Sequence, residues 1–178
     1  FKGIKQGIEN TNYLLRSKNK KFILTIFEKR VVKKEIPFFM KLMDQLSNLN
    51  INCPKPLKNN RGNYLIRVKN KISCVVTFLN GKDKKKLNLK NCFDIGKTIA
   101  QIHLSTKKLK LYRKNSMGIK NLNPLLNSIK FKSKEFINLE KFLKTNLKDI
   151  KSKWPKKLPQ GIIHGDLFID NIFFKGNK

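Results

Sequence analysis

The stretch Ile162-Ile163-His164-Gly165-Asp166-Leu167-Phe168-Ile169-Asp170-Asn171-Ile172-Phe173-Phe174 places a polar loop between two apolar runs. Each run predicts a short buried strand. Asp166 and Asn171 have four residues between them. A carboxylate can accept a proton from an alcohol, and a neutral amide oxygen can bind a hard cation without adding charge beside that base. A polar turn between two strands, with no chemistry, is the alternative that the spacing alone leaves open.

The spacing of these two side chains is that of a phosphoryl-transfer loop. In such loops the Asp takes the proton of the attacking hydroxyl and the Asn binds Mg²⁺. The sequence therefore predicts Asp166 as a catalytic base and Asn171 as a metal ligand.

The composition is strongly basic, with 41 Lys+Arg against 11 Asp+Glu and a formal charge of +30. Such an excess raises binding to nucleic acid or to an anionic surface as an alternative function. The lysines are spread along the whole chain, and no aromatic residues interleave with the densest run, residues 84–86. We therefore interpret the charge as a compositional bias of a solvated surface that helps attract an anionic substrate, and expect no specific nucleic-acid partner.

The length of 178 residues is enough for one domain or for two small lobes. No apolar run approaches the ~20 residues of a membrane span, so no membrane partner is expected. Cys53, Cys74 and Cys92 lie far apart and predict neither a zinc site nor a disulfide framework. A reduced, cytoplasmic location is the expectation. The chain begins at Phe1 and stops in what resembles a hairpin turn, so we expect a fragment cut at both ends.

The first half predicts a five-stranded antiparallel sheet with one helix inserted after the third strand. Strands are expected at residues 1–5, 13–16, 21–27, 64–68 and 72–79. The helix is expected from about residue 34 to residue 49. One apolar stripe is predicted to face the core, made of Phe39, Leu42, Met43, Leu46 and Leu49.

A tight loop joins the first two predicted strands, with the sequence Gly7-Ile8-Glu9-Asn10-Thr11-Asn12. Its backbone N–H groups and its short polar side chains could cover phosphates. It does not match the glycine-rich loops of P-loop proteins or of protein kinases. Taken alone, the loop is better explained as a hairpin turn.

The second half predicts mainly helices. Asn80-Gly81 punctuates the end of the sheet, and we place a lobe boundary there, between residues 1–79 and 80–178. Helices are expected at residues 89–106, with Cys92, Ile95, Ile99 and Ile102 facing inward, and at about 134–147. An irregular stretch is expected between them. His103 is interpreted as a half-buried structural side chain.

The order of sheet, inserted helix, hinge, helices and polar loop resembles the plan of the protein-kinase-like phosphotransferases. Gly165, in the run His-Gly-Asp, points to the branch that acts on small molecules. Within the aminoglycoside and choline kinase group, the chain resembles bacterial homoserine kinases of the aminoglycoside-phosphotransferase type. The resemblance runs in order along the chain, through residues 7–13, 22–28, 35–39, 113–118 and 163–171.

This resemblance implies an α+β, two-lobed kinase-like fold whose second lobe is mainly helical and incomplete. It implies phosphorylation of the side-chain hydroxyl of L-homoserine, a step toward threonine, with ATP and Mg²⁺ as cofactors. Asp166 would be the base, Asn171 a Mg²⁺ ligand, and residues 7–12 the cover of the ATP phosphates. Phe78 and Leu79 would lie near the adenine, and Glu35 would correspond to the helix glutamate that anchors a phosphate-binding lysine. An aminoglycoside or choline kinase remains the alternative within the same fold.

The chain departs from the wider kinase pattern in two ways. Thr25 stands where many relatives keep a Lys or Arg on the third strand, so a cation for the phosphates must come from elsewhere. Homoserine kinases of this type share the Thr. A second metal-binding Asp is expected beyond Lys178, so we expect the isolated chain to be inactive as a kinase and its parent to be active.

Overall fold

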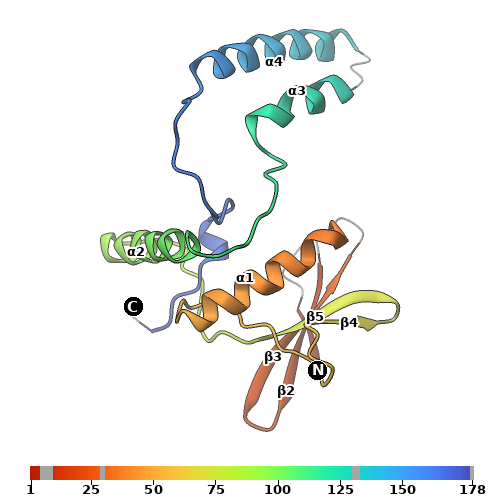
Figure 1. The fold of residues 1–178 in the computed structure, drawn as a ribbon, viewed down its shortest axis with the longest axis vertical. Helices are drawn as coiled ribbons and strands as arrows, with labels where there is room; N and C mark the ends of the chain where they lie inside the picture. Colours follow the sequence, from red (N-terminus) through yellow and green to blue (C-terminus); the bar gives the residue numbers. More distant parts are fainter. Residues whose placement is uncertain (5–9, 29–30, 130–132, 177–178) are drawn as a thin grey trace. The chain divides into compact units, whose positions relative to one another are not determined.

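The computed structural model describes residues 1–4, 10–28, 31–129 and 133–176 (Figure 1). It forms two compact units, one of residues 1–112 and 161–178 and the other of residues 113–160. The boundaries of these units, at residues 112 and 160, do not coincide with the predicted lobe boundary at residue 79. That lobe boundary stays a prediction. The first unit contains β1 Lys2–Ile4, β2 Asn10–Ser17, β3 Lys20–Phe27, η1 Lys33–Glu35, α1 Ile36–Asn48, β4 Leu65–Val68, β5 Lys71–Thr77, α2 Leu89–Thr106 and η2 Ile169–Asn171. The second contains α3 Ile119–Ser128 and α4 Lys134–Lys153.

The predicted sheet is confirmed: five antiparallel strands lie in the order β1-β2-β3-β5-β4, and α1 follows the third strand. The β2–β3 hairpin has a tight turn in which Lys18 adopts a positive φ of 47°. The β4–β5 hairpin turns at Lys69 and Asn70, with φ of 46° and 63°. Two successive positive φ values match the turn geometry that fits the twist of two paired strands. The hairpins therefore fix the register of the sheet.

One face of the sheet is covered by α1 (Figure 1). Ile36 and Met40 of the helix and Cys74 and Val76 of β5 form the buried cluster, and Ile23, Phe27, Leu65 and Ile72 are among the partly buried side chains packed against it. The predicted helix stripe was partly wrong. Leu46 is buried, but Phe39 and Leu49 are exposed. The helical stripe that meets the sheet starts at Ile36, the first residue of the helix, and Phe39 instead packs its ring edge-on against Phe38.

The bounds predicted for α2 are confirmed. Asn88 caps the helix: its side chain accepts from the Asn91 backbone N–H, while the Asn91 side chain accepts from Asn88 in return. The predicted inward face is correct except at Cys92, because Ile95, Ile99 and Ile102 are half-buried whereas Cys92 is exposed. His103, expected to be half-buried, is exposed as well.

The second unit contains a helix that the sequence did not predict. Residues 119–128 form α3, which packs against α4. Pro124 lies inside α3, and Pro is a poor helix former because its ring removes an N–H donor. A leucine is buried on each helix, Leu126 on α3 and Leu147 on α4. The other predicted helix is confirmed but continues to Lys153, and Ser133 caps its start.

In the part of the chain that the structure describes, none of the helices combines the length and the apolar character needed to cross a membrane.

Candidate active site

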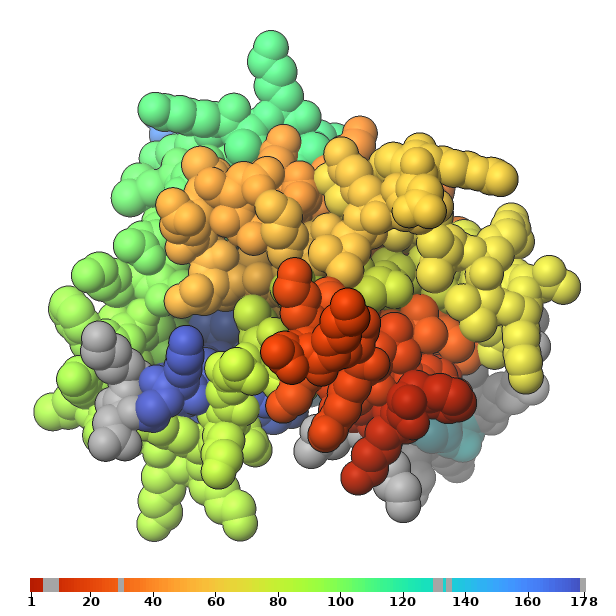
Figure 2. Space-filling model, turned by 90° about the horizontal axis from the view of Figure 1, so that it is seen from below, coloured from red at the N-terminus to blue at the C-terminus, as the bar shows by residue number. Residues whose placement is uncertain are grey.

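The loop that carries Asp166 and Asn171 is tied at its C-terminal end to the segment that follows β5. Lys82 and Phe174 exchange two backbone hydrogen bonds, with N···O distances of 3.0 and 2.9 Å. Phe174 is only 8% exposed, and the Lys84 ammonium lies 4.7 Å from the centre of its ring. Figure 2 shows these C-terminal residues (blue) beside the segment after β5 (yellow-green).

Gly81 allows this close approach. A Cβ atom at Gly81 would lie 3.0 Å from Cβ of Phe173 and 3.3 Å from the carbonyl oxygen of Phe174. These distances are too short for ordinary carbon contacts, so a larger residue would push the two segments apart.

The prediction that two buried strands flank the loop is wrong. Residues 162–163 form no strand, and Ile163 is 66% exposed. On the other side, Phe173 is 60% exposed and only Phe174 makes a bridge. An apolar run becomes a strand only where a neighbouring strand accepts its hydrogen bonds. Within the described residues, the backbone pairing of these runs is limited to the bridge between Phe174 and Lys82.

The polar residues of the loop are nonetheless brought together, as predicted. Gly165 adopts a φ of 78°, a conformation that favours glycine, and η2 turns the chain back toward Asp166. The Asn171 amide nitrogen then donates to the Asp166 backbone carbonyl at 2.8 Å and to its carboxylate Oδ2 at 3.2 Å. Both side chains are exposed to solvent. A carboxylate and an amide are thus presented side by side by a single turn.

The chemistry of this pair fits the predicted roles, which remain predictions. Because the amide nitrogen of Asn171 faces Asp166, its oxygen is left to bind a ligand. Mg²⁺ suits such a place, since it keeps several waters and takes one or two oxygen ligands from a protein. Among the described residues, no group of three or more His, Cys, Asp and Glu could hold a metal ion. Within the described residues, a metal held here would therefore rely on Asn171, with further ligands from outside them, such as the phosphates of a nucleotide.

Of the six residues predicted to cover phosphates, Gly7, Ile8 and Glu9 lie outside the described residues. Asn10, Thr11 and Asn12 begin β2. Successive strand side chains point to opposite faces of a sheet, so Asn10 and Asn12 share one face and Thr11 lies on the other. The three side chains therefore cannot all contact the same ligand. Their backbone groups could still line one side of a ligand.

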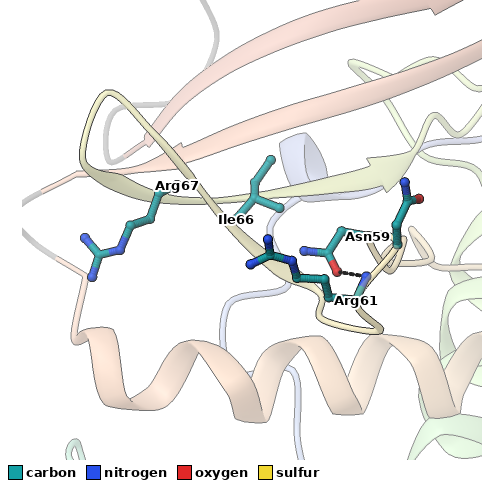
Figure 3. A pocket seen from close by; sticks show the side chains of 5 residues that line it. Asn59, Arg61, Ile66 and Arg67 are labelled. Carbon is teal, nitrogen blue, oxygen red and sulfur yellow. Dashed lines mark hydrogen bonds between the residues drawn. The ribbon is translucent and has the colours of Figure 1, made fainter.

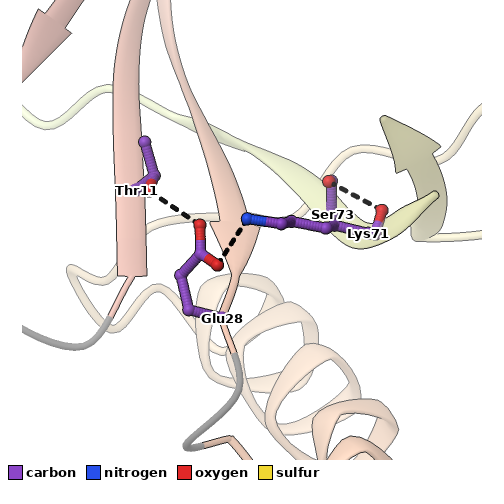
Figure 4. A network of polar contacts seen from close by, with 4 residues as sticks. All are labelled: Thr11, Glu28, Lys71 and Ser73. Atoms are coloured by element: carbon purple, nitrogen blue, oxygen red, sulfur yellow. Dashed lines mark hydrogen bonds and ion pairs between the residues drawn. The ribbon is translucent and has the colours of Figure 1, made fainter. Parts of the chain in front are cut away.

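The Thr11 side chain is already bound on its own face (Figure 4). Its hydroxyl donates to Glu28 Oε1 at 2.9 Å, and the Lys71 ammonium lies 2.6 Å from Glu28 Oε2. Bonding to Lys71 and then to Thr11 lowers the pKa of the Glu28 carboxyl. This network joins β2, the residue after β3, and β5. No local sequence pattern predicts this network, because Lys71 is 43 residues from Glu28.

Thr25, the departure on the third strand, lies directly opposite Asn12 in the β2–β3 register. Its hydroxyl donates to Asn12 Oδ1 at 2.8 Å. The residue that replaces the usual cation is therefore joined to a residue predicted to contact phosphates.

The remaining predicted site residues lie at the ends of elements. Glu35 closes η1, immediately before α1, and is half-buried. Phe78 and Leu79 follow β5, where the Phe78 N–H donates to the Lys21 carbonyl at 3.2 Å and the Lys21 ammonium lies 5.5 Å from the Phe78 ring centre. Their predicted contacts with the nucleotide stay predictions.

A separate groove of about 430 Å³ lies between β4 and the loop before it (Figure 3). Asn59, Asn60, Arg61, Ile66 and Arg67 line it. The Asn59 side chain shapes that loop, because its Oδ1 accepts from the backbone N–H groups of Arg61 and Asn63. None of the predicted site residues lines this groove, so it is not the site that the motif indicates.

Comparison with known proteins gives a consistent result over the whole chain. A homoserine kinase of Bradyrhizobium diazoefficiens is 38% identical over 180 residues, which cover 100% of this chain and 55% of that protein. A homoserine kinase of Parvibaculum lavamentivorans is 36% identical over 179 residues, covering 100% of this chain and 56% of the relative. The chain thus spans about half the length of the curated relatives it matches.

Solved structures show the same fold at low identity. Amicoumacin kinase, in complex with AMP-PNP, Ca²⁺ and Ami, superposes with a TM-score of 0.76 at 17% identity, over 96% of this chain and 54% of that one. Spectinomycin phosphotransferase, in complex with ADP and spectinomycin, gives a TM-score of 0.61 at 14% identity, over 99% of this chain and 60% of that one. These likenesses confirm the predicted kinase-like α+β fold.

A family model describes all of residues 1–178, and it is that of the phosphotransferase enzyme family, abbreviated APH. With the five-stranded sheet, the inserted helix and the Asp166–Asn171 turn in place, the chain belongs to this family of phosphotransferases.

Proposed function

We propose that the protein carrying this chain is an ATP-dependent kinase that phosphorylates the side-chain hydroxyl of L-homoserine, giving O-phospho-L-homoserine on the route to threonine. Membership in the phosphotransferase family supports the reaction class, and relatives that are homoserine kinases support the acceptor. The observation that carries the proposal is the contact between the Asn171 amide and the Asp166 carboxylate.

In this proposal, the Asp166 carboxylate aligns the acceptor hydroxyl and takes its proton as the phosphoryl group is transferred. The developing negative charge is spread over the transferred group, so positioning and electrostatics supply most of the rate. Mg²⁺, bound through Asn171, would supply charge neutralisation at the phosphates. Asn171 also holds the carboxylate in place, through its hydrogen bonds to the Asp166 backbone and side chain.

The proposed adenine contacts, Phe78 and Leu79, lie where β5 ends, and residues 7–12 would cover the phosphates. Glu35, immediately before α1, would correspond to the helix glutamate that anchors a phosphate-binding lysine in related kinases. We further propose a cytoplasmic location, and small molecules as the partners, with no specific nucleic acid and no membrane.

The test is turnover by the complete protein with ATP, Mg²⁺ and a panel of alcohols. L-Homoserine should be phosphorylated in preference to choline or an aminoglycoside. Asp166→Ala should lower kcat by on the order of 10²-fold or more. Asn171→Ala should raise the Mg²⁺ concentration that is needed for half-maximal activity. Preference for choline or an aminoglycoside would replace the acceptor and keep the reaction class, whereas unchanged kcat in Asp166→Ala would remove the proposed base.

A further inference from the structure

The inner face of the sheet, defined here as the face covered by α1, carries a contact between two polar residues that the proposed function has not used. Thr25 and Asn12 lie opposite each other on β3 and β2. Ile23 and Phe27 flank Thr25 at two-residue steps and pack against the α1 cluster, so Thr25 points to the same face. Asn12, its partner, must point there too.

The α1 helix covers only part of this face. The core residues that meet it come from β3, β5, β4 and the segments beside them, and none of those described comes from β1 or β2. Asn12 lies on β2, from which no described residue belongs to that apolar cluster. Asn10, two residues earlier on this face, has a buried Oδ1 that accepts no hydrogen bond from the described residues.

The hydrogen bond between the pair fixes the amide of Asn12. The Thr25 hydroxyl donates to Oδ1 at 2.8 Å, so the oxygen is turned toward β3 and the NH₂ group is turned away from it. An amide that is held in one orientation loses less conformational freedom when it binds a ligand. Its two N–H donors suit phosphate oxygens, and they add no charge to the site.

Resting on the proposed function, we infer that Thr25 is a positioning residue for the nucleotide. It holds the Asn12 amide so that its NH₂ group donates to a phosphate of ATP, and this neutral donor stands in for the missing cation on β3. Lys71 does not fill that place, because β5 side chains alternate and its ammonium is bound to Glu28 on the opposite face of the sheet.

The experiment measures binding of ATP and of adenosine to the complete protein by calorimetry. Thr25→Val keeps the shape of the side chain and removes the hydroxyl. It should raise the Kd for ATP by about threefold to tenfold, the range of one neutral hydrogen bond, and leave the Kd for adenosine within about twofold. Thr25→Ser restores the donor and should bind ATP within about twofold of the unsubstituted chain.

Asn12→Asp is the second variant, because it keeps the acceptor for Thr25 and replaces the NH₂ group by a charged oxygen. Repulsion from the phosphates should raise the Kd for ATP more than tenfold, again with little effect on adenosine. Thr98→Val is the matched control. It removes a threonine hydroxyl that bonds only within α2, to the carbonyl of Asp94, and should change neither Kd.

Each outcome decides the inference. Equal losses of ATP and adenosine binding in Thr25→Val, or no loss of either, would overturn it while leaving the proposed kinase intact. If Thr25→Val fails to fold by circular dichroism, Asn12→Asp and Thr25→Ser decide in its place. If the unsubstituted complete protein binds adenosine but not ATP, or neither, the inference and the nucleotide part of the proposed function both fall.

Discussion

Cys74 offers a direct chemical test of how α1 packs against the sheet. Its side chain is 2% exposed and belongs to the cluster that contains Ile36 and Met40. Burial raises the pKa of its thiol from 9.0 to about 11. Only the thiolate attacks a disulfide reagent, so at a pH below both values this shift lowers the reactive fraction about a hundredfold. Steric exclusion of the reagent adds to that factor.

The assay is the rate of labelling by a thiol-reactive disulfide in single-cysteine variants. Cys53→Ser with Cys92→Ser leaves Cys74 alone, and Cys53→Ser with Cys74→Ala leaves Cys92, which is exposed. The Cys74 variant should label at least about a hundredfold more slowly than the Cys92 variant in the folded chain. Both should label alike in concentrated urea. Comparable rates in chains that circular dichroism shows to be folded would mean that α1 does not cover β5 as described.

Two further predictions concern stability. Met40→Ala should lower the free energy of unfolding by about 2–5 kcal/mol in urea titrations, because it opens a cavity where a 2% exposed side chain now packs. The control is Lys41→Ala, at the neighbouring exposed position, which should change the free energy of unfolding by less than about 0.5 kcal/mol. Hydrogen bonds to Lys71, the larger effect, and to Thr11 lower the folded-state pKa of Glu28 below its ordinary 4.5. The stability that Glu28 contributes is therefore present above pH 4.5 and is lost as the pH falls through the lowered pKa. Glu28→Gln should therefore melt earlier at neutral pH and lose less of its Tm on acidification, and a parallel fall of Tm in both proteins would contradict this linkage.

The sheet could be predicted because its signals are local. Alternating apolar residues set the strands, and short polar turns such as residues 17–20 separate them. The apolar spacing predicted the inserted helix, but it did not predict which side of the helix packs against the sheet. Phe39 and Leu49 fit the periodic stripe, yet the sheet meets the helix along Ile36 and Met40. Periodicity gives the existence of an apolar face, and only the partner surface decides its centre.

The failures share one cause, which is that a partner distant in the chain decides the outcome. Residues 162–163 have the composition of a strand but find no strand to pair with in the described chain. Residues 119–128 contain Pro124 and several asparagines, which lower helix propensity, yet packing against α4 outweighs that preference. In the same way, the bond from Thr11 to Glu28 depends on the fold of β2 against β3.

The same reasoning explains why one part of the candidate site was predictable and another was not. Asp166 and Asn171 are five positions apart, and a single turn with Gly165 at positive φ is enough to join them. Thr25 and Asn12 are 13 positions apart and meet only through the β2–β3 register. A sequence motif can therefore identify the group that is proposed to move the proton. Asn12 was also predicted to cover the phosphates, but the contact with Thr25 that is proposed to orient it is found only once strand pairing is known. Alternation along β2 separates Asn12 from Thr11 and gives the two neighbours different partners.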